Sequence, residues 1–320
     1  MAVVPAAGAR VVAAWRPSHA GEPRFLAYSI TKTCIAVVIL GLRAEGRLSL
    51  DDPLARWYPD VPGARRISLR QMLRHTSGLR DYGGLGAYQE AVRRTSSSPW
   101  THETFARQTV ERGLSFEPDE GWAYSNIGYT FLRSIAERVA DASLARLVEE
   151  RIATPLALRR TDVVESMADM ADLAPAPTSE ITDDGSVVDT RAHYHPGWVS
   201  HGVVASTPSE IARCYDGLFG GRLVSLEAVA EMRELVPIGV PSAPWSEPSY
   251  GLGLMGDPAS PSGPIWGHEG GGPGYGASAF HAPALGGVTA CAMVAGPATA
   301  PREAGDLVRT VLAACPTGAA

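Results

Sequence analysis

The chain has 320 residues, of which 45% are hydrophobic and 19% are charged, an ordinary composition for a globular protein with a large core. Its formal net charge of −6, without a long basic run, argues against nucleic-acid binding. The longest apolar run, residues 34–42, is too short to cross a bilayer, so we expect no membrane association.

The N-terminal segment and the cysteines indicate a cytoplasmic protein. Residues 1–17 have no basic start, and their apolar stretch is interrupted by Pro5, Gly8 and Arg10, unlike a signal peptide. The four cysteines form no C-x-x-C pair, and their scattered positions suit reduced thiols better than a disulfide framework or a zinc site.

The first half of the chain is predicted to be mainly helical after two short strands. Apolar residues recur at helical spacing, and Ser or Thr residues stand where they can cap helix N-termini. The predicted elements are strands at 9–15 and 24–28, a helix from Ser29 to a C-terminal Gly46, and helices at 69–75, 102–112, 127–140 and from Ser143.

The second half changes character after a long irregular segment. Residues 167–194 are rich in Pro, Asp, Ser and Thr and are predicted to form a long excursion or lid. Short apolar runs between Gly and Pro turns then favour strands. The predicted elements are helices that begin at Pro208 and Ser225, strands at 250–256, 263–267, 275–282 and 286–296, and a final helix at 302–314.

This order of elements predicts an α+β fold. Strands joined by short turns pair antiparallel, since a parallel crossover needs a longer connection. We expect an antiparallel sheet flanked by terminal helices, with an all-helical lobe inserted between its early and late strands. The sheet lobe covers about 1–50 and 205–320 and the helical lobe about 51–204, with a pocket at the seam.

The stretch AYSITKTCIA, residues 27–36, contains the only lysine of the chain. Ser29 and Lys32 are three residues apart, so on a helix they share one face and their side chains can touch. A serine hydroxyl needs a base to become a nucleophile. A buried lysine can be that base, whereas arginine does not lose its proton in proteins. The alternative is a solvated or salt-bridged lysine early in a helix.

A second group lies in GWAYSNIGY, residues 121–129, at a predicted turn before a helix. Tyr124 can act as a general acid or base if a nearby cation lowers its pKa. Asn126 offers a donor and an acceptor, and could hold both a lysine and a substrate amide. A capping asparagine beside a packed aromatic residue is the alternative.

A third group is WGHEGGGPGYGASAF, residues 266–280. His268 opens a glycine-rich stretch in which a substrate could approach the backbone closely, because glycine has no side chain. Backbone N–H groups there could face a developing oxyanion. A glycine-rich hairpin with an incidental histidine is the alternative.

With its S-x-x-K, Y-x-N and H-x-G motifs in this order, the chain resembles the serine β-lactamase-related superfamily. The resemblance is to the branch of class C β-lactamases, DD-peptidases, D-aminopeptidases and family VIII carboxylesterases. Tyr124 stands where a serine stands in the related S-D-N motif, and His268 where K-T-G has lysine. The other matching segments are 45–59, 67–79, 116–137, 154–162, 201–213 and 250–254.

The resemblance implies a mechanism without a metal or an organic cofactor. Ser29 attacks an ester, amide or lactam carbonyl, and Lys32 with Tyr124 moves the proton to the leaving group. Asn126 orients Lys32 and the substrate. His268 would hydrogen-bond Tyr124 or a substrate carboxylate. Gly270 is the glycine of the H-x-G motif, and the N–H of Gly271, which follows it, would form the oxyanion hole together with the N–H of Ser29.

Some segments depart from the family pattern. Only 28 residues precede Ser29, Asp119 replaces a glycine usual in F-x-P-G, and residues 80–100 match no motif. These regions, with 167–194, would shape the substrate pockets. His75 is interpreted as a structural residue of the HTSG turn. Trp198, His201 and Tyr275 are candidate pocket-lining residues. His193 and His195 could be a metal-binding pair, but no third ligand is evident near them.

The favoured function is an esterase or peptidase-like hydrolase of small esters, amides or peptides. Replacement of a permanent lysine cation by His268 weighs against β-lactam carboxylate binding. An acyltransferase or peptide cyclase would use the same acyl-enzyme, and a β-lactamase or D-aminopeptidase is a further alternative. A non-catalytic binding protein on the same scaffold is the alternative from another class.

Overall fold

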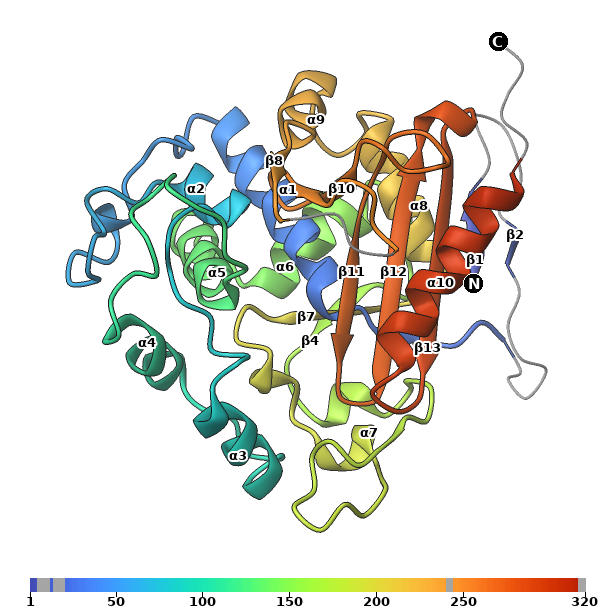
Figure 1. Ribbon diagram of the computed structural model, residues 1–320, viewed down its shortest axis with the longest axis horizontal. Helices are drawn as coiled ribbons and strands as arrows, with labels where there is room; N and C mark the ends of the chain where they lie inside the picture. Colours follow the sequence, from blue (N-terminus) through green and yellow to red (C-terminus); the bar gives the residue numbers. More distant parts are fainter. Residues whose placement is uncertain (5–11, 14–20, 240–243, 316–320) are drawn as a thin grey trace.

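The computed structural model describes residues 1–4, 12–13, 21–239 and 244–315. A large antiparallel sheet lies on one side of the molecule, and a group of helices and long loops lies on the other (Figure 1). Helix α1, Thr31–Ala44, runs between these two parts. The structure therefore has the predicted α+β architecture.

The main sheet has eight strands in the order β2-β1-β13-β12-β11-β10-β9-β8, and all neighbouring pairs are antiparallel. Strands β12 and β13 agree with the predicted positions, whereas β11 continues five residues beyond the strand predicted at 263–267, and the single strand predicted at 250–256 is two short strands, β9 and β10. His268 on β11 pairs with Ala279 on β12. The strands are β1 Ala2–Val4, β2 Val12–Ala13, β8 Val236–Pro237, β9 Ser249–Tyr250, β10 Met255–Asp257, β11 Ile265–Gly272, β12 Tyr275–Ala282 and β13 Val288–Ala295.

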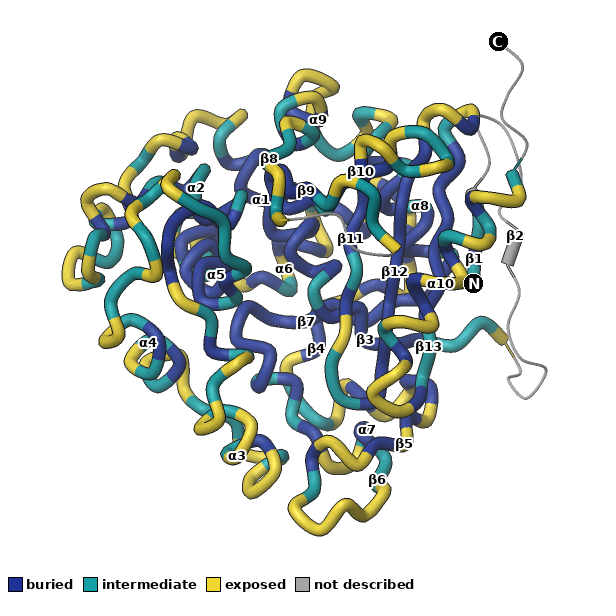
Figure 2. The backbone as a smooth tube through the Cα atoms, in the orientation of Figure 1, coloured by how far each residue is buried: buried dark blue, intermediate teal, exposed yellow. Residues whose placement is uncertain are grey.

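Helices cover both faces of this sheet. Helix α10, Ala300–Ala314, packs on one face through Ala304, Val308 and Leu312, which share a core with residues of β12 and β13. Helix α8, Pro208–Phe219, packs on β1, β12 and β13. Every residue of β12 is buried, as expected for a strand with both faces covered (Figure 2).

The predicted caps position several helices of the other part. Ser68 and Gln71 form a reciprocal capping box at α2, and Thr101 and Ser143 each accept a backbone N–H at a helix start. At α5 the cap is Ser125, which was not predicted, and not Asn126. These helices are α2 Leu69–Arg74, α3 Gly86–Arg94, α4 His102–Val110, α5 Asn126–Ala140, α6 Leu144–Val148 and α7 Thr190–His193, and Ser225 caps α9 Leu226–Met232.

Residues 51–204 differ from the expectation of an all-helical lobe. Strand β4, Asp162–Val164, pairs with β7, Val203–Ser206, which also pairs with β3, Phe25–Leu26. The segment predicted as an excursion or lid contains a two-strand ladder of β5, Pro177–Thr178, with β6, Val188–Asp189. The pairings of β7 with β3 and β4 join the middle of the chain to its beginning, which local patterns do not reveal.

Four further elements differ from prediction. Strand β1 was not predicted, and helix α3 lies within the unassigned segment 80–100. The strand expected at 9–15 falls mostly outside the described residues, with β2 as its described part. The predicted helix from Ser29 begins as a 3₁₀ turn, Tyr28–Ile30, that leads into α1.

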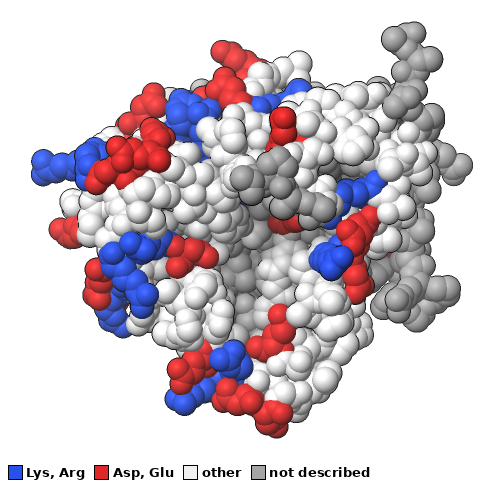
Figure 3. All heavy atoms as spheres, in the orientation of Figure 1, with Lys and Arg blue, Asp and Glu red and all other residues white. Residues whose placement is uncertain are grey.

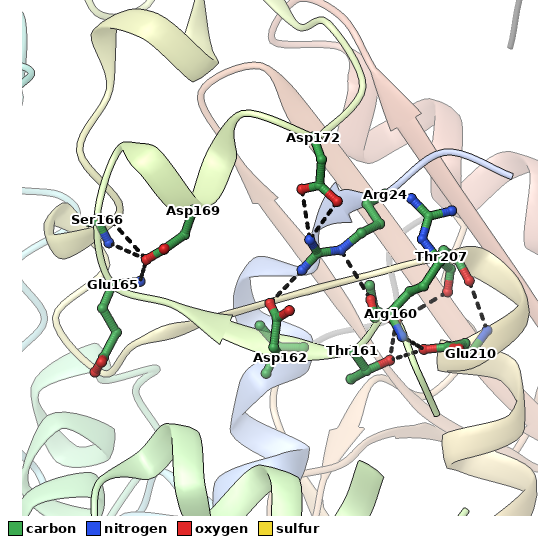
Figure 4. Close-up of polar contacts among 12 residues, drawn as sticks. Arg24, Arg160, Thr161, Asp162, Glu165, Ser166, Asp169, Asp172, Thr207 and Glu210 are labelled. Atoms are coloured by element: carbon green, nitrogen blue, oxygen red, sulfur yellow. Dashed lines mark hydrogen bonds and ion pairs between the residues drawn. The ribbon is translucent and has the colours of Figure 1, made fainter. Parts of the chain in front are cut away.

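A buried arginine ties β3 to the central part of the chain (Figure 4). Arg24 is 6% exposed, and its guanidinium pairs with Asp162 and Asp172 and donates to the carbonyl of Arg160. Glu210 on α8 holds the same segment through the backbone N–H of Arg160. The strand that leads into the Ser29 turn is therefore fixed from several sides.

Candidate active site

Ser29 lies in the 3₁₀ turn between β3 and α1. Tyr28, directly before it, has a φ of 44°, a left-handed conformation that is strained for a residue with a bulky side chain. Backbone hydrogen bonds hold the turn, because Ala27 N–H donates to the Val204 carbonyl and Val204 N–H donates to the hydroxyl of Thr31. Ser29 remains partly exposed, so a substrate could reach its hydroxyl.

Lys32 is fully buried one turn later, and its amine contacts three polar side chains. Its Nζ lies 3.2 Å from Ser29 Oγ, 2.7 Å from Asn126 Oδ1 and 3.2 Å from His201 Nε2. Burial lowers the pKa of Lys32 well below its ordinary 10.5, and the charge of Asp81 only partly opposes that shift. The amine beside Ser29 is therefore a stronger candidate base than an exposed lysine.

Asn126 occupies the first position of α5 and bridges the two parts of the molecule. Ser125 caps the helix by accepting the N–H of Gly128 at 3.2 Å. The N–H of Asn126 donates to Asp81 Oδ1 at 2.9 Å, and its side-chain oxygen accepts from Lys32. The predicted contact between Asn126 and Lys32 is thus present in the structure.

Tyr124 lies over the lysine from the helical side. Its ring centroid is 4.7 Å from Lys32 Nζ. Burial raises the pKa of the Tyr124 phenol, and a hydrogen bond with Ser29 opposes this only in part. A lowered pKa and a basic role were expected for Tyr124 if a cation lay nearby, whereas burial, together with the charge of Asp81, disfavours a phenolate and keeps the phenol protonated.

His75 holds the backbone on both sides of Tyr124. The N–H of Ala123 donates to the His75 carbonyl at 3.0 Å, and the N–H of Ser125 donates to His75 Nδ1 at 3.1 Å. His75 itself has a φ of 62° at the end of α2. The structural hydrogen-bonding role predicted for the HTSG histidine is confirmed.

His268 makes contacts that differ from those expected. Its Nε2 lies 2.8 Å from the hydroxyl of Tyr250, and its Nδ1 lies 2.5 Å from the carbonyl of Glu269. Both ring nitrogens therefore have partners other than Tyr124. Burial, with the nearby charge of Lys32, lowers the pKa of His268 to about 3, so the ring is neutral at ordinary pH.

The glycine-rich part of β11 lies against the Ser29 turn. A Cβ added to Gly270 would stand 2.2 Å from the Ala27 carbonyl oxygen and 3.0 Å from the Ser29 nitrogen. Real side chains do not approach backbone this closely, so glycine is required there. A Cβ added to Gly271 would instead meet Pro301 of α10, so a side chain at this position would point to the α10 side of the sheet.

The remaining predicted residues fall into two groups. Trp198 and Tyr275 are completely buried and donate to the carbonyls of Ser96 and Ala174, so they are packing residues and do not line an open pocket. His193 and His195 contact nearby backbone groups. Within the described ranges, no three His, Cys, Asp or Glu side chains are grouped to hold a metal ion.

Two contacts of the site were missed by sequence reasoning. Asp81 lies in the segment that matched no motif, and only its position after the HTSG turn could have drawn attention to it. His201 was expected to line the pocket, but its contact with Lys32 joins residues 169 positions apart. A pairing over that distance has no local signal in a single sequence.

The molecular surface is hollowed on the face that shows the seam between the helical part and β11 (Figure 3). Most atoms around this hollow belong to uncharged residues. Among the described residues, no helix is both long enough and apolar enough to cross a membrane. Ser29 and Tyr124 are partly exposed and lie beside the buried amine of Lys32.

This fold and this set of side chains agree with a known family. A family model described as Beta-lactamase matches residues 1–314. The chain belongs to the beta-lactamase family. The match includes the S-x-x-K, Y-x-N and H-x-G motifs and both parts of the fold.

Solved structures of this fold match almost the whole chain. A D-stereospecific amidohydrolase from a Streptomyces species is 30% identical with a TM-score of 0.85, covering 99% of this chain and 93% of that one. A D-amino acid amidase from Ochrobactrum anthropi SV3 is 22% identical with a TM-score of 0.82, covering 98% and 92%. The second likeness supports the fold alone.

Curated relatives from the same family are longer. Penicillin-binding protein 4* of Bacillus subtilis (strain 168) is 27% identical over 268 residues, which are 77% of this chain and 55% of that protein. Esterase EstB of Burkholderia gladioli is 32% identical over 157 residues, 44% of this chain and 40% of that protein. This chain thus spans about half the length of the curated relatives it matches.

Proposed function

We propose that this protein is a serine hydrolase that works through an acyl-enzyme on Ser29. The observation that carries the proposal is the contact of 3.2 Å between Ser29 Oγ and the buried amine of Lys32. Burial lowers the pKa of Lys32, so a neutral amine is available to take the hydroxyl proton.

The proposed reaction begins when Ser29 Oγ attacks a carbonyl carbon and Lys32 receives the proton. The carbonyl oxygen becomes an oxyanion, for which the N–H groups of Ser29 and Gly271 are the proposed donors. The bond to the leaving oxygen or nitrogen then breaks, and that atom takes a proton from Lys32 through Tyr124. Water attacks the resulting ester and releases the acid and Ser29.

The roles of the tyrosine and histidine follow from their environments. Because its pKa is raised, Tyr124 serves as a protonated relay between Lys32 and the leaving group, and Lys32 alone is the resting base. His268 is neutral and bonded to Tyr250, so it shapes the wall of the site and does not supply a fixed positive charge.

The proposed substrates are small esters, amides or peptides, and amides of D configuration are included because the Streptomyces relative is a D-stereospecific amidohydrolase. A neutral His268 gives no cation for a β-lactam carboxylate, which disfavours a β-lactamase. The four cysteines are free thiols, which supports the cytoplasmic location that we propose. Transfer of the acyl group to an amine or alcohol remains the alternative outcome of the same intermediate.

The first test is turnover of a substrate panel by the wild-type protein and two variants. The panel contains p-nitrophenyl esters, D-amino-acid amides and nitrocefin, each with and without an added amine acceptor. Ser29→Ala should lower kcat at least about a thousandfold. Lys32→Arg keeps the charge but removes the base, so it should lower kcat about 100- to 10,000-fold.

The matched control is Arg43→Lys on the same helix, where Arg43 pairs with Glu231 away from Ser29. This exchange should leave kcat within a factor of about two, since surface pairs contribute little. Full activity in folded Ser29→Ala, or near-normal kcat in folded Lys32→Arg, would refute the proposed mechanism. Products formed only when an amine is present would assign a transferase.

A further inference from the structure

His201 is the third polar side chain that contacts the amine of Lys32, beside Ser29 and Asn126. It is 2% exposed, and its Nε2 lies 3.2 Å from Lys32 Nζ. The motifs of the sequence assign His201 no catalytic task. Its burial beside the proposed base nevertheless means that any hydrogen bond between them acts in a medium of low dielectric, where it is strong.

The backbone around His201 is held in a defined turn. The N–H of Gly202 donates to the Val199 carbonyl at 2.8 Å, and Gly202 has a φ of +86°, which favours glycine. Ser200 is hydrogen-bonded through its N–H and its hydroxyl to the phenol oxygen of Tyr82. The imidazole therefore approaches Lys32 from a fixed position.

The number of partners around Lys32 matches the valence of a neutral amine. Such an amine has two N–H groups and one lone pair, and Nζ has three polar neighbours. Asn126 Oδ1 can only accept, whereas the hydroxyl of Ser29 can donate. If His201 Nε2 also accepts, both hydrogens are used and the lone pair is left facing Ser29.

We propose that His201 is a positioning residue that accepts an N–H of Lys32 through Nε2 and so aims the amine lone pair at Ser29. This inference rests on the proposed function, because it gives His201 a role in activating the nucleophile. After Lys32 takes the proton of Ser29, its three N–H groups still have the same three acceptors. No bond to His201 has to break during the proton transfer.

A neutral imidazole is needed for this role, and the surroundings favour one. Burial lowers the pKa of His201 well below 6.5, and the charges of Lys32 and Arg133 act in the same direction. His75 and His268, which also face this region, lower the pKa of His201 further when charged. The accepting tautomer carries its hydrogen on Nδ1, which has no partner among the described residues.

The groups that face Lys32 determine what its titration reports. Asp81 raises the pKa of Lys32, while burial lowers it. The rings of Tyr124 and Tyr129 lie 4.7 and 5.5 Å from the amine. An acceptor at His201 stabilises the ammonium form more than the amine, so its removal should lower the pKa of Lys32 further.

The test uses the fact that Lys32 is the only lysine in the chain. Protein labelled with ¹³C at the lysine ε-carbon, without lysines in any tag, gives one lysine resonance whose shift follows protonation of this amine. The titration is compared for wild type, His201→Leu, His201→Gln and His281→Leu. Glutamine keeps an acceptor near the position of Nε2, leucine does not, and His281 packs on Phe219 in another part of the fold.

The titration midpoint should fall by about 1 to 2 pH units in His201→Leu, the shift expected for one hydrogen bond to a charged group. It should stay within about half a unit in His201→Gln and His281→Leu, because each retains the acceptor. An unchanged midpoint in His201→Leu, or a raised one, would overturn the proposal. A raised midpoint would mean that His201 donates to the amine.

Kinetic measurements distinguish an effect of His201 on the orientation of the Lys32 amine from an effect on its pKa. At a pH above the Lys32 midpoint of every variant, the amine is neutral, so a remaining loss of kcat reports orientation. His201→Leu should then lose about 10- to 100-fold in kcat with KM nearly unchanged, and His201→Gln should recover most of it. Equal plateau values for wild type and folded His201→Leu would contradict the positioning role.

Two controls distinguish loss of the His201 contact from misfolding of a variant and from failure of the proposed function. Thermal unfolding shows whether each variant is folded, and His201→Met, also without a comparable acceptor, replaces the leucine variant if that one does not fold. Reaction with a fluorophosphonate tests Ser29 separately. A wild-type protein without a Ser29 adduct defeats the proposed function, whereas an adduct with an unchanged lysine titration defeats only the role of His201.

Discussion

At the scale of single residues, the site keeps several ionisable groups uncharged. Burial lowers the pKa of Lys32, His75, His201 and His268, and raises that of Tyr124. A charge on any of the three histidines would repel a charge on Lys32. Burial makes the Lys32 amine a weaker base but leaves it unprotonated at lower pH, so it can accept the proton of Ser29.

The neutral state of His268 predicts a loss of stability in acid. Between about pH 6.5 and about pH 3, the unfolded chain binds a proton at this residue that the folded chain does not, so the free energy of unfolding falls as pH falls. His268→Gln lacks this proton. As pH falls through that window, the free energy of unfolding of wild type should fall more steeply than that of His268→Gln. The two slopes should differ by about 1.4 kcal/mol per pH unit.

Urea unfolding of wild type and His268→Gln between pH 4 and pH 8 measures this difference. The two curves should run parallel above about pH 7, where the histidine is neutral in both states. Parallel curves throughout would show that His268 titrates normally in the folded protein, which would remove the environment described for it.

Sequence reasoning identified the residues whose relation is local or carried by a motif. Ser29 and Lys32 are one turn apart, and Tyr124 and Asn126 flank a capped helix start, so their types and spacing are informative. The partners of His268 and His201 were not predictable, because they depend on where β9 and the turn before β7 pack in the folded chain.

At the scale of elements, the contact between β11 and the Ser29 turn sets the width of the site. Gly270 lies directly against the backbone of Ala27 and Ser29, and Gly272 lies against the ring of Tyr28. Any side chain on these glycines would push the strand away from the turn. The glycine-rich sequence is thus needed for close packing of backbone on backbone.

Gly270→Ala should consequently damage both stability and turnover. Its methyl group would overlap the Ala27 carbonyl oxygen, so we expect a loss of about 1–3 kcal/mol in the free energy of unfolding, with reduced kcat. Gly296→Ala is the control, since a Cβ there meets nothing within 4 Å. Unfolding and kinetic measurements that find the two variants alike would disprove the close contact.

Prediction of elements succeeded where local chemistry decides the structure. The caps at Ser68, Thr101 and Ser143 depend on side chains and N–H groups three residues apart, and the strand runs 275–282 and 288–295 are bounded by turn residues. The short strands β1 and β4 are stabilised by partners far away in the chain. Each has three residues, too few to carry a recognisable pattern.

At the scale of the whole molecule, the site is assembled from both parts of the fold. Ser29 comes from the 3₁₀ turn before α1 and Lys32 from the start of α1. Tyr124 and Asn126 come from the helical part, and His268 comes from the sheet. The order of motifs indicated this assembly through the family resemblance. The lengths and pairings of segments 80–100 and 167–194, which border it, could not be predicted.

The central claim is that Ser29 forms the covalent intermediate, and mass spectrometry of the intact protein tests it most directly. Wild-type protein treated with a fluorophosphonate should gain the mass of one phosphonyl group, and peptide mapping should place that group on Ser29. Folded Ser29→Ala should gain none. A wild-type protein that is folded yet unmodified, or one modified at another residue, would contradict the account.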